Sequence, residues 1–111
     1  MAFDPLAQTA APVIANGANT SNAFWIREAR TGLLTLPAAM TANSVKFQTS
    51  AALDGTFATL KDSAGSDVSV SIANGACVQI PAAVFSGAAA LKIVGNANEA
   101  AARTLTVQMK S

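Results

Sequence analysis

Strict alternation of apolar and polar side chains in the second half of the chain is the feature that most limits its fold. From residue 44 to 49, Val45, Phe47 and Thr49 share one side, and polar residues occupy the positions between them. The segments 67–72 and 104–110 repeat this pattern. Because successive side chains of a β-strand point to opposite faces, the alternation predicts antiparallel strands with one buried and one wet face. The predicted core face carries Val45, Phe47, Val68, Val70, Ile72, Ile93, Leu105 and Val107.

Turn residues separate these segments. Ala64-Gly65-Ser66 is expected to close a hairpin with arms at 57–61 and 67–72. Asn74-Gly75 favours the positive φ angles of a type I′ turn, and it joins the second arm to a strand at 77–80.

The remaining segments are less regular. Short strands are expected at 13–14, 23–27 and 33–36, and a single helical turn at 81–85, where proline is tolerated in the first position. The alanine-rich stretch 97–103 is expected to be a loop, with a helix as the alternative because alanine favours helices.

The fold class predicted from these patterns is all-β: an antiparallel β-sandwich or jelly roll of about seven to nine short strands. Residues 1 to about 10 show neither strand nor helix periodicity and few apolar side chains, which indicates an extended end. We therefore expect an extended N-terminal arm over residues 1–20 and a single β-sandwich domain over residues 21–111.

The charge of the chain bears on its partners. Charged residues make up only 12% of the sequence, and seven basic and six acidic residues give a net charge of +1. A free monomer usually carries more charge for solubility, so we expect a homo-oligomer, a dimer or a trimer, or a chain held on a larger partner. Basic residues form no cluster, which opposes nucleic-acid binding. The sequence has no long apolar run and no signal-peptide pattern, which opposes a membrane or secretory role.

Few side chains could support chemistry. The sequence has no histidine and a single cysteine, Cys77, without a basic neighbour that would lower its pKa. The six carboxylates, Asp4, Glu28, Asp54, Asp62, Asp67 and Glu99, show no catalytic spacing. The turn from Asp62 to Asp67 is rich in oxygen but lacks the ligand spacing of a calcium loop. We therefore expect no enzymatic activity, no small-molecule substrate, no cofactor and no metal.

Five residues are the candidates for contacting a partner. Trp25 and Arg27 would lie on the face of their strand opposite Phe24 and Ile26, and both residue types are enriched at interface hot spots. In the expected arm, apolar side chains could enter pockets of a partner while the proline limits the entropy lost on binding. These arm residues are Phe3, Pro5 and Leu6.

The order of motifs from residue 33 to 111 resembles a known group of proteins. The motifs are the strand Val45–Ser50, the run Asp54–Val70, the turn Ile80–Phe85, the strand Leu91–Gly95 and the segment Arg103–Val107. They resemble small β-sandwich proteins with a galactose-binding-like jelly-roll pattern, which are encoded among the structural genes of tailed bacteriophages.

This resemblance implies a structural virion protein of the capsid decoration (cement) type. Such a protein would bind the major capsid protein on the outer capsid surface and would be assembled in the host cytoplasm. The alternative is a binding module of the phage tail, baseplate or neck that recognises host glycans through Trp25. The group supplies no functional residues to transfer to this chain.

Overall fold

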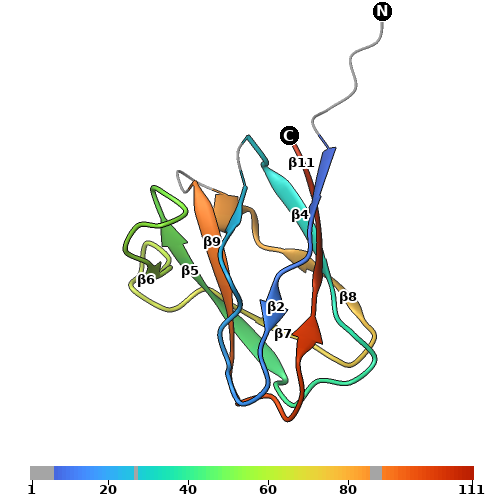
Figure 1. Ribbon diagram of the computed structural model, residues 1–111. Coiled ribbons are helices and arrows are strands. Elements are labelled where there is room, and N and C mark those ends of the chain that lie inside the picture. Colours follow the sequence, from blue (N-terminus) through green and yellow to red (C-terminus); the bar gives the residue numbers. More distant parts are fainter. Residues whose placement is uncertain (1–6, 27, 86–88) are drawn as a thin grey trace, which may run out of the picture.

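The described residues form two larger antiparallel sheets and a separate two-stranded ladder. Figure 1 shows their arrangement. The computed structural model describes residues 7–26, 28–85 and 89–111. The all-β sandwich class predicted from the alternation is confirmed. In the described residues, no helix is long and apolar enough to cross a membrane.

The first sheet has the strand order β1-β11-β4-β8. Its strands are β1 (Ala7–Ala10), β11 (Thr106–Lys110), β4 (Thr31–Thr35) and β8 (Cys77–Ile80). The second sheet has the order β3-β9-β5-β6, and β7 also pairs with β5. Its strands are β3 (Phe24–Trp25), β9 (Ala90–Gly95), β5 (Ser44–Ser50), β6 (Ala58–Thr59) and β7 (Ser69–Ser71). A short ladder joins β2 (Val13–Ile14) to β10 (Arg103–Thr104).

The core lies between the sheets, where the alternation predicts it. Six of the eight predicted core residues are buried, and Val68 and Val70 are partly buried and pack against them. Phe47 and Ile93 face each other across the β5–β9 ladder, and both are fully buried. The predicted turn at residues 81–85 is a 3-10 helix, η1 (Ala82–Phe85), with Val84 buried.

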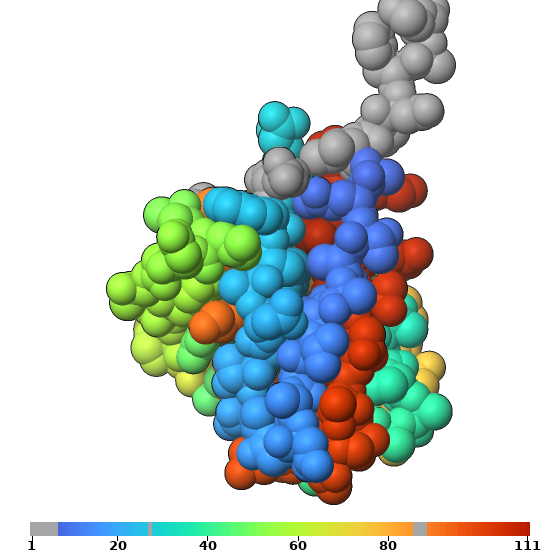
Figure 2. All heavy atoms as spheres, viewed as in Figure 1, coloured from blue at the N-terminus to red at the C-terminus, as the bar shows by residue number. Residues whose placement is uncertain are grey.

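The expected arm differs from the structure over residues 7–10, whereas the short strand expected at 13–14 is present. Ala7–Ala10 pairs with β11 over its whole length, and Val13–Ile14 pairs with β10. In the space-filling view these first strands lie directly against the C-terminal strand (Figure 2). Hydropathy does not reveal this pairing, because a strand edge is completed by backbone N–H and C=O groups whatever the side chains are.

The two predicted turns are present, but the strands that they join do not pair with each other as simple hairpins. Residues 60–68 form a short hairpin tip, with Val68 N donating to Leu60 O at 3.0 Å, but β6 and β7 then each pair with β5. Gly75 has the expected positive φ of 69°, yet its turn connects β7 in one sheet to β8 in the other. The Asn74-Gly75 segment is held by hydrogen bonds to the loop that contains Pro37 and Met40.

Phe47→Ala tests the core. Because Phe47 is fully buried, we expect the substitution to lower the free energy of unfolding by about 3–5 kcal/mol, measured by chemical denaturation. Thr59→Ala on the exposed strand β6 is the control and should change it by less than about 0.5 kcal/mol. A loss below about 1 kcal/mol for Phe47→Ala would contradict this packing.

Candidate interaction surfaces

The outer face of the first sheet is nearly free of charge. The pairing register places outward side chains in rows across the strands, for example Thr9, Gln108, Leu33 and Gln79. We call the outward residues of this sheet the outer face. Its residues are Ala7, Thr9, Thr31, Leu33, Thr35, Cys77, Gln79, Thr106, Gln108 and Lys110.

This outer face has the chemistry of a protein contact surface. Lys110 is its one charged side chain, and Leu33 near its centre is 43% exposed. An open depression of about 630 Å³ lies over the face and is lined by residues of all four strands. Threonine, glutamine and leucine side chains offer hydrogen bonds and apolar contact without the desolvation cost of a charge. Depletion of charged residues is typical of the buried centre of interfaces.

Trp25 lies on the other sheet. It pairs with Ala90 on β9 and is 41% exposed, whereas its neighbours Phe24 and Ile26 are buried. The two faces predicted for this strand are therefore correct for these three residues. Further along β9, the Lys92 ammonium lies 4.6 Å from the centre of the Phe57 ring. Because Trp25 is partly exposed, its indole is available to a partner or a ligand.

The other candidates cannot be placed. Phe3, Pro5, Leu6 and Arg27 lie outside the described residues. Of the proposed contact residues, Trp25 is the one that lies within the described residues.

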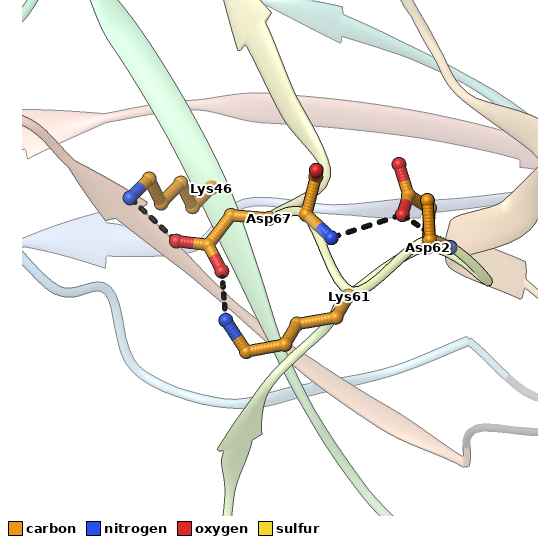
Figure 3. A network of polar contacts seen from close by, with 6 residues as sticks. Lys46, Lys61, Asp62 and Asp67 are labelled. Atoms are coloured by element: carbon orange, nitrogen blue, oxygen red, sulfur yellow. Dashed lines mark hydrogen bonds and ion pairs between the residues drawn. The ribbon is translucent and has the colours of Figure 1, made fainter.

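The Asp62–Asp67 turn uses its carboxylates internally (Figure 3). One oxygen of Asp62 accepts hydrogen bonds from the backbone N–H groups of Ala64 and Ser66, at 2.9 and 3.0 Å. Asp67 bridges the ammonium groups of Lys46 and Lys61, at 2.7 and 2.5 Å.

The two lysines affect the titration of Asp67. The hydrogen bond from Lys46, followed by that from Lys61, lowers the pKa of Asp67 to about 2. In the described part of the chain, no group of three or more histidine, cysteine, aspartate or glutamate residues comes together. The turn is therefore built as a hairpin tip with an ion-paired base.

Glu99 is the residue whose role the sequence does not reveal. Its side chain is fully buried, and its two oxygens accept hydrogen bonds from the N–H groups of Thr41 and Ala42, at 2.8 and 2.9 Å. The Arg103 Nε donates a third, at 3.0 Å. The Glu99 backbone also bonds to Gly17 and Ala18, so one residue ties three loops together.

Electrostatics keeps Glu99 ionised. Burial raises the pKa of Glu99, but the backbone hydrogen bonds from Thr41 and Ala42, with Arg103, outweigh this and hold it below its ordinary value. The sequence signal is the single charge within the alanine-rich stretch 97–102, four residues before Arg103. That spacing is typical of a helical ion pair, but the structure has no helix at 97–103, and the loop expected there from the sequence is confirmed.

Glu99→Gln tests this contact. The variant should lose about 2 kcal/mol of unfolding free energy at neutral pH, because Arg103 loses its charged partner and, with the amide oxygen facing Arg103 and Thr41, the Ala42 N–H loses its acceptor. Glu28→Gln, an exposed carboxylate, is the matched control and should change little.

The same contact predicts a pH dependence. The pKa of Glu99 is lower in the folded protein than in the unfolded chain. The ionised carboxylate therefore stabilises the fold at any pH above the unfolded-state pKa, and this stabilisation is lost as the pH falls toward the folded-state pKa. The difference in unfolding free energy between wild type and Glu99→Gln should therefore become smaller as the pH is lowered. Urea denaturation at several pH values measures it. A gap that stays constant down to acid pH would show that the carboxylate charge is not involved.

Comparisons with known proteins show the fold and leave the family open. No protein-family model matches the chain, and no curated protein matches it. Among solved structures, it is similar to the one titled "Crystal structure of SPBc2 prophage-derived protein YomS", with a TM-score of 0.60 and 10% sequence identity. The match covers 100% of this chain and 98% of that chain. At this identity the likeness shows a shared fold over all of this chain and nearly all of the other.

Proposed function

We propose that this chain is a non-enzymatic structural protein of a tailed bacteriophage virion, a capsid decoration protein that binds and stabilises the major capsid protein on the outer surface of the head. The observation that carries the proposal is the outer face of the first sheet, where Lys110 is the one charged side chain. A surface of this kind is poorly suited to a free monomer and well suited to lasting contact with another protein.

The fold also supports a phage origin for this chain. The chain shares its architecture along its whole length with a protein that is described as prophage-derived. The motif resemblance to virion β-sandwich proteins is an independent sign of the same origin. In this proposal Leu33 and its row on the outer face make the central contact, and Phe3, Pro5 and Leu6 extend the contact to a neighbouring capsid subunit.

A second candidate function rests on Trp25. An indole that is 41% exposed on the opposite sheet could stack on a sugar ring, as expected for a glycan-binding module of a tail or baseplate. This function requires the Trp25 surface, and capsid decoration in the proposed form requires the outer face. One set of variants therefore distinguishes the two functions.

The test is occupancy on particles. We expect the protein to bind capsids assembled from the major capsid protein of its own phage, and Leu33→Lys should weaken this binding by about tenfold or more, because it places a charge at the centre of the contact. Leu53→Lys is the matched control, since Leu53 is a similarly exposed leucine, 38% against 43%, outside the outer face. Quantitative gel analysis of sedimented particles measures both.

Two further variants complete the test. Removal of residues 1–6 leaves β1 intact, whereas a deletion through residue 10 would remove a strand of the sheet. The short deletion should lower occupancy while leaving thermal stability unchanged. Binding to host-cell glycans that Trp25→Ala abolishes and Leu33→Lys does not would favour the glycan module. Equal occupancy for Leu33→Lys and wild type would contradict the proposed contact.

A further inference from the structure

The two larger sheets have four edges, and three of them are short, charged or bridged. The edge at β3 has a strand of two residues. The edge formed by β6 and β7 is flanked by the charged side chains of Lys61 and Asp67. At β1, the Gln8 side chain donates to the Ile26 carbonyl at 2.9 Å and bridges the edge to the segment before β4. Charges, short strands and covering contacts are the usual protection of sheet edges against pairing.

In the part of the chain that the structure describes, the edge at β8 has none of these features. Its four residues, Cys77–Ile80, carry no charge and no proline. Cys77 is exposed. Figure 1 shows β8 at the margin of its sheet, with β4 on its inner side.

The pairing pattern shows which backbone groups are free. Leu36 N donates to Ala76 O at 2.9 Å in the register that continues the β4–β8 ladder. Directly bonded pairs alternate along an antiparallel ladder, so Leu34 with Val78 and Gly32 with Ile80 are the next bonded pairs. The N–H and C=O groups of Cys77 and Gln79 therefore point away from β4. In the described residues, no hydrogen bond engages them.

We propose that β8 pairs antiparallel with β8 of a second copy, around a twofold axis at Val78, so that the four-stranded sheets of two molecules form one continuous sheet. This inference does not rest on the capsid role. It concerns the edge of the first sheet, whereas the proposed decoration contact uses its outer face.

The register follows from the free groups. A twofold axis at Val78 places Cys77 of each copy opposite Gln79 of the other, and these are the residues whose backbone groups point outward. All four N–H groups and all four C=O groups of the two copies can then pair in two closed rings. A register centred on either outward residue would leave part of these groups without a partner.

The side chains are compatible with a second copy. Alternation carries through the junction, so Cys77 and Gln79 of both copies remain on the outer face and Val78 of both copies remains on the core side. The half-buried Val78 gains its own counterpart as a close neighbour, since unbonded antiparallel pairs approach most closely. No charge in β8 opposes a charge in the other copy. An isologous contact of this kind closes after two copies.

The single cysteine of the chain makes the register measurable. In the Val78-centred register, the two copies of Cys77 are diagonal neighbours, with Cα atoms roughly 7–8 Å apart. A nitroxide attached to Cys77 should therefore show strong dipolar broadening at high protein concentration. Mixing with excess unlabelled protein should remove the broadening, and sedimentation should show a monomer–dimer equilibrium over the same concentrations.

Proline substitutions identify the edge. Gln79→Pro removes an N–H that points away from β4, so the fold keeps its own hydrogen bonds while the dimer loses two. We expect the dimer dissociation constant to rise by about tenfold or more. Thr9→Pro in β1 is the matched control: its N–H also points outward from the sheet, because Pro12 with Leu105 and Ala10 with Val107 are the bonded pairs. Thr9→Pro should leave the dimer unchanged.

A charge exchange tests the register without proline. In the double variant Cys77→Lys/Gln79→Lys, like charges face each other in both rings, and we expect a monomer at all concentrations. In Cys77→Glu/Gln79→Lys, opposite charges face each other in both rings, and dimerisation should return. Circular dichroism and thermal melting establish that each variant is folded.

Three results would overturn the proposal. They are a wild-type protein that remains monomeric up to millimolar concentration, a dimer that Thr9→Pro abolishes and Gln79→Pro does not, and equal behaviour of the two charge variants. Each is measured on the free protein, so each is independent of whether the protein decorates particles.

Discussion

The β5–β9 ladder is the element on which the rest of the structure depends. It joins six Cα pairs, from Val45 with Gly95 to Ser50 with Ala90, and places Phe47 against Ile93 in the dry centre of the molecule. Every other strand of the second sheet attaches to one of these two strands. A shift of one residue in this register would turn the buried side chains toward solvent, so the hydrophobic effect holds the pairing in place.

Sequence patterns predict the strands with a buried face and miss those without one. Alternation predicts the strands of the second half of the chain correctly, because apolar side chains such as Val45 and Leu105 must be buried away from water. Strand β1 carries no large apolar side chain, and backbone pairing alone places it beside β11. Glu99 is missed for a related reason: its partners Thr41 and Ala42 are backbone amides from a distant loop, which no local spacing encodes. Of the candidate contact residues, the exposure of Trp25 follows from strand alternation, whereas the charge-poor outer face emerges only when four strands are aligned in register.

The distribution of charge separates the two sheets. The second sheet carries Lys46, Lys61 and Asp67 in a solvated cluster, and exposed pairs of this kind contribute little to stability. Their effect is on association, because a charged edge resists pairing with other strands. Apart from Lys110, the first sheet has neutral side chains on its outer face and on both of its edge strands. The chemistry of association is thus concentrated on one half of the sandwich.

The antiparallel pairing of β1 with β11 has a mechanical consequence. Ala7 is paired with Lys110, so the two ends of the described chain leave the sheet side by side, as Figure 1 also shows. Tension that pulls the two ends apart would break the backbone hydrogen bonds of this ladder one after another, starting at the pair of Ala7 and Lys110. Such a geometry yields at low force. Tension spread across the broad side of the sheet would load many contacts simultaneously. A molecule that must withstand sustained strain is therefore better anchored through the flat side of its first sheet than through its chain ends.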